Sequence, residues 1–385
     1  MSRDVGEARP KRDARSGKER SVMSFKPSIH WLLGFIPITV ALEHGGAAPP
    51  LVFFSAALAI IPVAALIALS TEHIATRTGD AVGGLLNSTF GNLPELIISV
   101  VALKAGLFDM VRASLVGAIL ANLLLALGVA FFLGGLRYRI QDYNPVAARM
   151  YSSMMLIAVI SLAVPSAFGR LLTSQETSLK EAHLNLGLAA VLLLAYGLYL
   201  VFMLKTHPDM FSKTGGGGDK EDHDHGPQWS VGRAVGTLVG ASVLAAWMSE
   251  VLVGAAEPTG RALGMTDTFI GIVFLAIVGG AAESGSAIMM ARKNRMDLSV
   301  GIALGSCIQI ALFVAPVLVL ASHFIAPAPL TLAFGKGEVG CLFMGVLLGA
   351  MVAGDGRSNW YKGVQLVSVY TIIAMLFYFM PEVAP

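Results

Sequence analysis

Two glutamates stand inside long apolar stretches of this 385-residue sequence. Glu95 lies in GLLNSTFGNLPELIISVVAL and Glu283 lies in FIGIVFLAIVGGAAESGSAIMMA. A charged side chain near the middle of a membrane-spanning helix costs at least roughly 2.5 kcal/mol and marks a functional position by default. The central parts of the apolar stretches contain no Lys or Arg that would give a structural ion pair. We therefore expect each glutamate either to be protonated or to hold a mobile cation.

Two carboxylates that lie close together raise each other's proton affinity, so a pair of them can exchange protons for one divalent cation. Backbone oxygens near both glutamates are candidate further ligands. Pro94 frees the carbonyl of Phe90 and Gly91 helps the chain bend, while Gly279 and Gly280 offer the same freedom in the second stretch. Ca²⁺ takes six to eight hard oxygen ligands, whereas Zn²⁺ favours Cys and His. Ordinary kinking or close helix packing is the alternative explanation for the proline and the glycines.

Polar side chains accompany the first glutamate at helical spacing. Ser88, Asn92, Glu95 and Ser99 lie at positions i, i+4, i+7 and i+11, which predicts one shared helical face. We expect Asn92 to be a cation ligand and the two serines to line the ion pathway.

Further polar residues in apolar surroundings are candidates for the same pathway. Asn122 and Gln309 are amides that either hydrogen-bond between helices or line the cavity of the glutamates. Three more glutamates, which lie near the ends of apolar stretches, are either ion-entry groups or solvated interfacial carboxylates: Glu72, Glu250 and Glu257.

The elements that position these residues are predicted to be membrane-spanning helices. The chain is 55% hydrophobic and only 14% charged, against about 25% charged residues in soluble domains. A spanning helix needs roughly 20 mostly apolar residues, which predicts an all-α polytopic membrane protein with about eleven transmembrane helices. The predicted spans are residues 29–47, 50–69, 80–103, 113–135, 146–168, 183–204, 231–254, 267–291, 298–321, 338–354 and 360–380. The net charge of +2 is too small to indicate a nucleic-acid partner.

The distribution of basic residues predicts the orientation of these spans. With the amino terminus in the cytoplasm, 21 of the 27 Lys and Arg residues fall on the cytoplasmic side. Cytoplasmic loops carry an excess of Lys and Arg, so we expect a cytoplasmic amino terminus and an external carboxyl terminus.

An internal repeat divides the chain. Glu95 and Glu283 are 188 residues apart, and each is followed by a helix with a Gly-Ala or Gly-Ser pair and an amide. Five predicted helices per half is an odd number, so the two halves insert with opposite orientation, as in many secondary transporters. The predicted divisions are a basic disordered tail (1–28), an extra helix (29–47), the first repeat (50–204), a flexible linker (205–230) and the second repeat (231–380). The acidic and histidine-rich run 219–225 in the linker either senses metal or is a solvated loop.

Two segments carry a resemblance to a known family. GGLLNSTFGNLPELIISVVALKAG, residues 83–106, resembles the first signature of the Ca²⁺/H⁺ antiporters of the cation/Ca²⁺ exchanger superfamily, and residues 268–314 resemble the second. Residues 204–211 and 355–379 are also similar to family segments. The resemblance implies ten core helices in two inverted halves after one extra helix. It also implies that Glu95 and Glu283 are the paired ion- and proton-binding glutamates. The other positions that match the family's signature residues are Asn92, Asn122, Ser306 and Gln309.

The sequence departs from the family pattern at several site positions. Gly280 stands where the second signature usually has Asn, and Ser284 replaces the usual His. Leu93-Pro94 replaces a small pair, and Ala118 and Ala121 replace serines. These departures leave fewer polar side chains along the expected ion pathway.

The function expected from the residues and the resemblance is secondary active transport. Ca²⁺ would leave the cytoplasm in exchange for protons by alternating access, without a cofactor, across a membrane that we expect to be the bacterial cytoplasmic membrane. The same fold could also serve an Na⁺/Ca²⁺ or Na⁺(K⁺)/H⁺ exchanger. A channel remains a further alternative, whereas an intramembrane enzyme would need a nucleophile or a metal motif such as HExxH, which the sequence lacks. The oligomeric state stays open.

Overall fold

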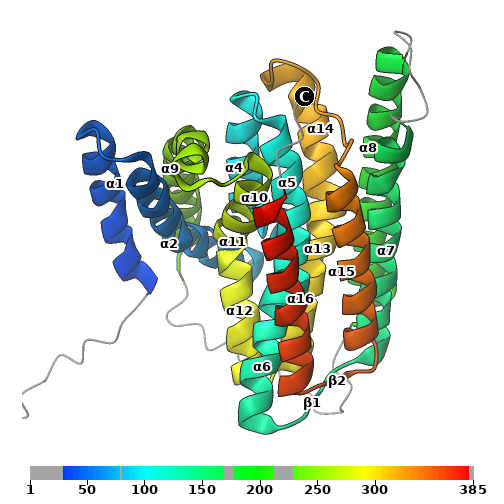
Figure 1. Ribbon diagram of the computed structural model, residues 1–385. Coiled ribbons are helices and arrows are strands. Elements are labelled where there is room, and N and C mark those ends of the chain that lie inside the picture. Colours follow the sequence, from blue (N-terminus) through cyan, green and yellow to red (C-terminus); the bar gives the residue numbers. More distant parts are fainter. Residues whose placement is uncertain (1–28, 79, 169–176, 212–228, 381–385) are drawn as a thin grey trace, which may run out of the picture.

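The computed structural model describes residues 29–78, 80–168, 177–211 and 229–380, and these residues are almost entirely helical (Figure 1). The helices are α1 (Phe35–His44), α2 (Pro49–Ala75), α3 (Asp80–Phe90), α4 (Leu93–Lys104), α5 (Phe108–Leu120), α6 (Leu127–Tyr138), α7 (Pro145–Phe168), α8 (Thr177–Val201), α9 (Val231–Leu263), α10 (Asp267–Phe269), α11 (Ala276–Gly279), α12 (Ala281–Arg292), α13 (Met296–Gln309), α14 (Ala315–Ile325), α15 (Lys336–Ala353) and α16 (Trp360–Phe379). Two short strands, β1 (Gln141–Asp142) and β2 (Arg357–Ser358), pair antiparallel. A 3₁₀ turn, Ile29–Gly34, precedes α1.

π-helical turns join several of these helices into longer rods. Ala121–Ala126 connects α5 to α6, Ile270–Leu275 connects α10 to α11, and Ile310–Val314 connects α13 to α14. A π turn inserts one extra residue into a helical turn and is frequent at functional sites.

Eight helices within the described residues are long and apolar enough to cross a membrane, and the bent pair Asp267–Gly279 and Ala281–Arg292 makes nine if it is one span. The chain is thus a polytopic helical membrane protein, as its composition predicts. Two other predicted spans are short or broken: the first apolar helix covers only Ile29–His44, and the stretch 80–103 is divided between α3 and α4.

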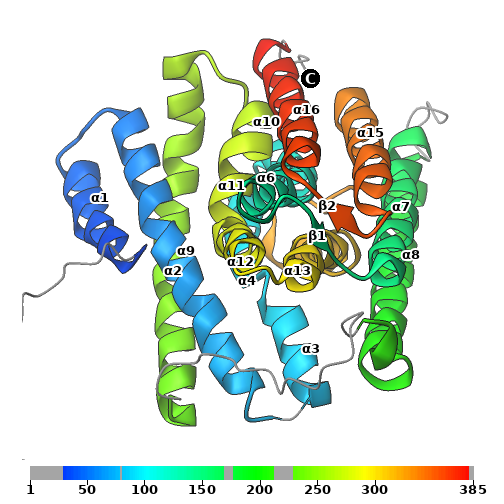
Figure 2. The same cartoon turned by 90° about the horizontal axis from the view of Figure 1, so that it is seen from below.

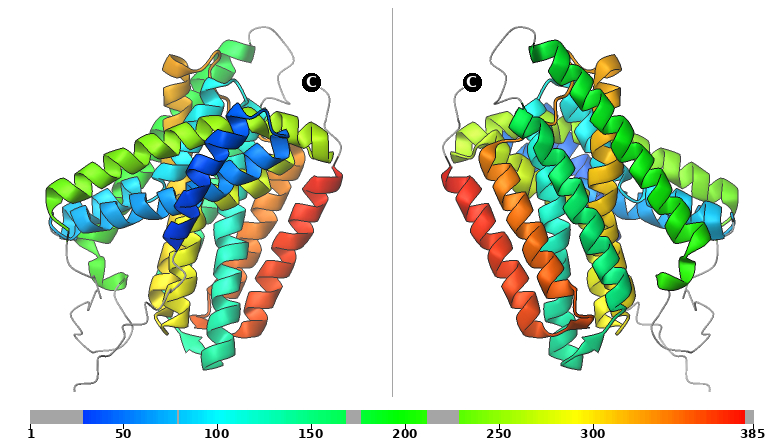
Figure 3. Two further views of the ribbon diagram at one scale, coloured as in Figure 1. Left: turned by 90° about the vertical axis from the view of Figure 1, so that its left-hand side faces the viewer. Right: turned by 90° about the vertical axis from the view of Figure 1, so that its right-hand side faces the viewer.

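α2 and α9 form a long helix pair that packs on one side of the main bundle. They run side by side and are strongly inclined to the remaining bundle (Figures 2 and 3). The two helices bury a small apolar cluster that includes Val63, Ile67, Ala241 and Ala245. A larger continuous core holds α5 to α8 and α13 to α16 together. The molecule is therefore built from an inclined helix pair and a main bundle, with the broken helices between them.

Close helix packing in the main bundle depends on small residues. An added Cβ at Gly117 would overlap the backbone of Ile272, and one at Gly271 would lie 2.8 Å from the carbonyl oxygen of Met110. Nearby, the Cys307 thiol donates to the carbonyl of Ile119 at 3.4 Å. α5 and the π turn before α11 consequently approach each other almost at backbone contact, as small residues at membrane helix interfaces allow.

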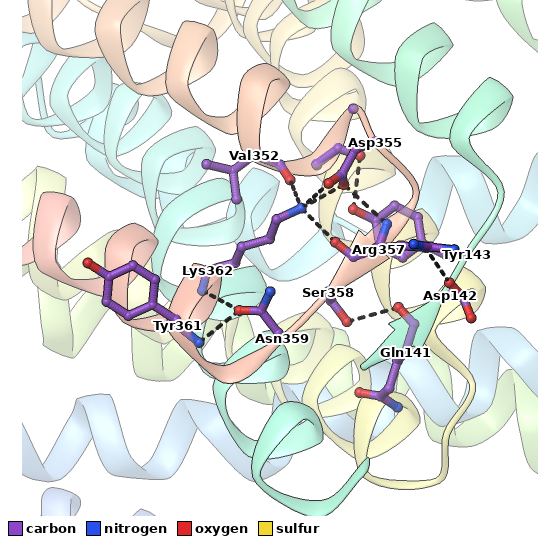
Figure 4. Close-up of polar contacts among 12 residues, drawn as sticks. Gln141, Asp142, Tyr143, Val352, Asp355, Arg357, Ser358, Asn359, Tyr361 and Lys362 are labelled. Carbon is purple, nitrogen blue, oxygen red and sulfur yellow. Dashed lines mark hydrogen bonds and ion pairs between the residues drawn. The ribbon is translucent and has the colours of Figure 1, made fainter. Parts of the chain in front are cut away.

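A network that we term the strand clamp, residues 141–144 and 352–362, ties one end of the main bundle together (Figure 4). The ammonium group of Lys362 donates to both carboxylate oxygens of Asp355 at 2.6 Å and to the carbonyls of Val352 and Arg357. The buried Gln141 donates to the carbonyl of Ala291 at the end of α12. The clamp thereby connects α6, α7, α15 and α16 to the helix that carries Glu283.

Candidate ion-binding site

The first helix break directly precedes Glu95. α3 ends at Phe90, Asn92 caps the next helix with φ −94° and ψ 26°, and α4 begins at Leu93. Pro94 is the second residue of α4, where its missing N–H has no intrahelical partner in any case. The proline therefore starts a new helix and does not kink a continuous one.

One sequence prediction fails at this break. Ser88 belongs to α3, whereas Glu95 and Ser99 belong to α4, so the expected continuous face from residue 88 to residue 99 is wrong. Glu95 and Ser99 still lie one turn apart on α4, where both are buried. Asn92 is a capping residue in the break and not part of a helical face.

The second break directly precedes Glu283 and confirms the interruption expected at the paired glycines. α11 ends at Gly279, Gly280 caps α12 with φ −80° and ψ 14°, and the two helices meet at a bend of 59°. The carbonyl of Gly280 accepts the first hydrogen bond of α12 from the N–H of Ser284 at 3.0 Å. The second lone pair of the Gly280 carbonyl oxygen remains available to bind an ion.

Glu95 and Glu283 are each the third residue of the helix that follows a break. Their side chains are buried, with 6% and 8% of the residue surface exposed. Both carboxyl oxygens of Glu95 and one of Glu283 have no hydrogen-bond partner, and within the described residues neither carboxyl pairs with a Lys, Arg or His. A permanent ion pair, which was the structural alternative for these glutamates, is therefore absent from this part of the chain.

The second break packs directly against the first glutamate. An added Cβ at Gly279 would lie 2.9 Å from Cγ of Glu95, and one at Gly280 would lie 3.5 Å from its Oε1. The break before Glu283 is thus in contact with the side chain of Glu95, and both glutamate side chains are buried. Ionising both at once in this apolar site requires a cation.

Two buried asparagines complete the polar surroundings of the glutamates. Asn92 donates from Nδ2 to Oε1 of Gln309, which leaves Oδ1 of Asn92 buried and without a partner. Asn122 is only 1% exposed, and neither atom of its amide has a hydrogen-bond partner among the residues that the structure describes. Its Nδ2 lies 3.6 Å from the position of a Cβ on Gly280. The structure thus brings Asn92, Asn122 and Gln309 near Glu95, and Gln309 makes the interhelical hydrogen bond that the sequence left open as one of two alternatives.

The unpartnered oxygens around the breaks form a ligand set suited to a hard cation. Leaving a buried polar group unsatisfied costs about 1–3 kcal/mol. The described residues contain no group of three or more His, Cys, Asp or Glu side chains that would indicate a transition-metal site. The buried unpartnered atoms around the breaks are Oδ1 of Asn92, both oxygens of Glu95, both amide atoms of Asn122 and Oε2 of Glu283. Carboxylate and amide oxygens are the ligands that Ca²⁺ prefers.

The other predicted pathway residues lie on elements outside the two helix breaks. Glu257 forms an ion pair with Arg261 on its own helix. Glu250 and Glu257 line a separate cavity of about 440 Å³ between α9 and the end of α4, together with Lys104. Glu72 is in the last turn of α2 and Ser306 is buried in α13. The tail 1–28 and the run 219–225 lie outside the described residues.

Two supporting features were missed by the sequence analysis. The strand clamp involves Gln141, Asp355 and Lys362, which the sequence presents only as loop or span-end residues. The close approach of α5 to the π turn depends on Gly117. The sequence analysis interpreted its Gly-Ala pair only as part of the internal repeat. Both features stabilise the helices that carry the polar site without contributing to it.

Several known proteins are similar to this chain in sequence and in structure. The family model described as "Sodium/calcium exchanger protein" matches residues 49–205 and 233–379. A Ca²⁺/H⁺ antiporter of Synechocystis sp. is 39% identical over 91% of this chain and 96% of its own length. A Ca²⁺/H⁺ antiporter of Aphanothece halophytica is 40% identical over the same shares of the two chains. The crystal structure of the selenium-substituted Ca²⁺/H⁺ antiporter protein YfkE superposes with a TM-score of 0.77, at 36% identity, over 91% of this chain and 99% of that one.

Proposed function

Because the chain belongs to the sodium/calcium exchanger protein family, we propose that it is a Ca²⁺/H⁺ antiporter that exports cytoplasmic Ca²⁺ in exchange for protons. The identity of 38–40% to proteins named Ca²⁺/H⁺ antiporters over nine tenths of the chain supports the choice of ions. The observation that carries the proposal is the pair of buried glutamates, for which the described residues offer no basic partner. No step of this exchange requires an enzyme activity or a cofactor.

The exchange follows from mutual exclusion at one site. Glu95 and Glu283 bind either protons or one Ca²⁺, since two neighbouring carboxylates in hydrocarbon must be neutralised by one or the other. A Ca²⁺ ion arriving from the cytoplasm displaces the protons, and protons arriving from the other side displace the ion. The protein does not change sides with an empty site, because two ionised carboxylates without a cation are too unfavourable in hydrocarbon. The Ca²⁺ flux is therefore coupled to the proton flux.

The remaining ligands are oxygens from the breaks. Gln309 holds the amide of Asn92 so that its Oδ1 is free to bind the ion. The last carbonyls of a helix have no partner within it, and such helix ends coordinate cations in interrupted transporter helices. We assign this role to the backbone oxygens at the ends of α3 and α11, which are those of Phe90, Gly91, Gly279 and Gly280. The remaining pathway residues are Ser88, Ser99, Asn122, Ser306 and Gln309 in the bundle, with Glu72, Glu250 and Glu257 as entry groups.

The architecture fits alternating access. We infer eleven spans, with two inverted five-helix halves after one extra helix, because the two breaks are 188 residues apart and each is followed by a glutamate. The inclined pair α2–α9 is the element that moves, and the clamped main bundle stays rigid. By the distribution of basic residues the amino terminus and the strand clamp face the cytoplasm, and the carboxyl terminus lies outside. The bacterial inner membrane is the proposed location.

The test is transport by the purified protein in liposomes without sodium. An imposed pH gradient should drive ⁴⁵Ca²⁺ uptake, and an added Ca²⁺ gradient should move protons in the opposite direction. Uptake that requires sodium instead of a pH gradient would assign an Na⁺/Ca²⁺ exchanger on the same fold. Conduction of Ca²⁺ without proton movement would indicate a channel and would contradict the proposal.

A further inference from the structure

The helix that carries Glu283 is anchored at its far end by one buried side chain. Gln141, in strand β1, is only 2% exposed. Its Nε2 donates to the carbonyl of Ala291, in the last turn of α12, and to Oδ1 of Asn294, both at 2.9 Å. A backbone carbonyl can only accept a hydrogen bond, so the amide must present its NH₂ group to α12. Both hydrogens of this group are therefore used on the end of the helix.

The residues around Gln141 are suited to this contact. Asn294 has a φ of 59°, a left-handed conformation that favours Gly and is otherwise tolerated best by Asn. A glycine would serve the backbone equally well, but it would offer no oxygen to Gln141. An added Cβ at Gly134 would overlap Oε1 of Gln141 and push the amide away. The neighbours of Gln141 on α6 and after α12 thus both let its amide reach the helix end.

The first half of the chain has a different arrangement at the corresponding place. Gly106, which is 188 residues before Asn294, has a φ of 79° after the end of α4. An added Cβ there would have Cγ of Pro327 as its nearest neighbour, at 3.4 Å. The residue 188 positions after Gln141 is Pro329, whose side chain has no donor. The helix of Glu95 thus ends against an apolar contact, whereas the helix of Glu283 ends on an amide.

A fixed end of α12 fixes Glu283, because the face between them has no interlocking side chains. Glu283, Ala287 and Ala291 follow one another at intervals of four residues on one face of α12, and all three are buried. α12 packs mainly against α6 and α13. Alanines let helices approach closely but form no ridges that would resist sliding. The other end of α12 is joined to α11 through Gly280 alone, so its position along the bundle is set where Gln141 binds.

We propose that Gln141 is a positioning residue for ion binding: its amide sets the place of Glu283 in the site without contributing an atom to it. This inference rests on the proposed antiport at Glu95 and Glu283. α4, which carries Glu95, packs mainly along α9 of the inclined pair, whereas α12 is tied to the main bundle. Groups outside the ligand set that orient a metal ligand have a strong effect on affinity. The anchor therefore holds one of the two carboxylates at the separation that binds the cation.

The experiment measures the KM for Ca²⁺ and the maximal rate of pH-driven ⁴⁵Ca²⁺ uptake by the full-length protein in liposomes. Gln141→Met keeps the length of the side chain and removes both donors, so the KM should rise about 5–10-fold while the maximal rate changes less than about twofold. Asn294→Gly keeps the left-handed turn and removes one acceptor. The KM of this variant should rise about threefold, with a thermal midpoint close to that of wild type. The double variant should be no worse than Gln141→Met, because Asn294 acts through Gln141.

Asp355→Asn is the matched control for stability. It weakens the same strand clamp, but the hydrogen bonds of Asp355 go to Lys362 and to the N–H of Arg357 and not to α12. Its KM should therefore stay within about twofold of wild type although its thermal midpoint falls. A purely structural role of Gln141 would give the same pattern, a lower thermal midpoint with an unchanged KM.

Three results would overturn the inference: an unchanged KM in a folded Gln141→Met protein, an equal rise in the Asp355→Asn protein, or a double variant in which the two single effects multiply. If Gln141→Met does not fold, Asn294→Gly decides alone. A raised KM with a wild-type thermal midpoint then supports the anchor, and an unchanged KM rejects it. Absence of Ca²⁺/H⁺ exchange in the wild-type protein would instead remove the proposed function, so the two failures are distinguishable.

Discussion

Glu95 and Glu283 occupy the same place in two separate helices: each is the third residue after a break whose capping residue has nearly the same backbone angles. Both side chains are buried, and the glycine that ends α11 packs against the side chain of Glu95. The carboxylates therefore lie at the amino-terminal ends of two helices, where the exposed N–H groups favour negative charge. This placement lets the protein hold two ionised carboxylates whenever a cation is present between them.

The first prediction concerns the charge of the pair. Glu95→Gln and Glu283→Gln should each reduce pH-driven Ca²⁺ uptake at least 100-fold, because a single carboxylate leaves a divalent ion half neutralised in hydrocarbon. Uptake into liposomes with equal amounts of folded protein is the measurement. Glu43→Gln, on the exposed side of α1, is the control and should transport normally. Full activity of either site variant would contradict the assignment.

The second prediction concerns the orientation of Asn92. Gln309→Ala removes the hydrogen bond that holds the amide, whose net value is about 1 kcal/mol. The KM for Ca²⁺ should rise roughly 5–10-fold, with a smaller change in the maximal rate. The exposed Gln365 on α16 offers a matched control through Gln365→Ala. An unchanged KM for Gln309→Ala would show that Asn92 is oriented by other groups or does not bind the ion.

The third prediction concerns helix packing. Gly117→Ala would force a methyl group into the backbone of Ile272, and overpacking of this kind costs about 1–3 kcal/mol. The thermal midpoint of the purified protein should therefore fall by several degrees. Gly197→Ala places the same methyl group on α8 with no atom within 4 Å, so its midpoint should stay level or rise slightly. Equal midpoints for the two variants would show that α5 can move away from the π turn without loss.

The fourth prediction is a pH dependence of the strand clamp. Burial alone would raise the pKa of Asp355, but the hydrogen bonds from Lys362 and from the N–H of Arg357 outweigh it and hold this pKa below its ordinary value of 3.8. A carboxyl whose pKa is lowered by folding stabilises the protein above its unfolded pKa and loses that contribution as the pH falls through the folded pKa. Asp355→Asn should thus lower the thermal midpoint between pH 5 and pH 8, and the difference should shrink as the pH falls below 3.8 and through the lowered pKa of the folded protein.

The expected loss is modest, under about 1 kcal/mol, because the Asp355 side chain is half exposed and solvent screens the pair. Lys362→Met should cause a comparable loss, and the double variant should be little worse than the single ones. Fully additive losses would show that the two residues stabilise the clamp independently.

The central chemistry could be predicted from the sequence because it depends on composition. Glu95 and Glu283 are conspicuous in stretches without Lys or Arg. The paired glycines before Glu283 predicted a helix break, which the structure contains. The proline before Glu95 was placed correctly but interpreted as a kink in a helix interior. Only the local backbone shows that Pro94 starts a new helix, which is why the predicted face including Ser88 does not exist.

Pairings between distant segments could not be predicted. Asn92 and Gln309 are 217 residues apart, and nothing in their local sequence indicates that their side chains form a hydrogen bond. The strands β1 and β2 have two residues each, too few for any alternating pattern. The contact of Gly279 with the side chain of Glu95 likewise joins two helices that are far apart in the sequence. Such features arise from tertiary packing, which periodicity along the chain does not encode.

Proton release on Ca²⁺ binding is the most direct test of the shared site. The measurement is calorimetric titration of the purified protein with Ca²⁺ in two buffers of different ionisation enthalpy, which counts the protons released per ion bound. Protons that occupy Glu95 and Glu283 must leave when the ion enters, so the wild-type protein should release between one and two protons at a pH where both carboxyls are protonated. Ca²⁺ binding without proton release across the whole pH range would contradict exchange at a common pair of carboxylates.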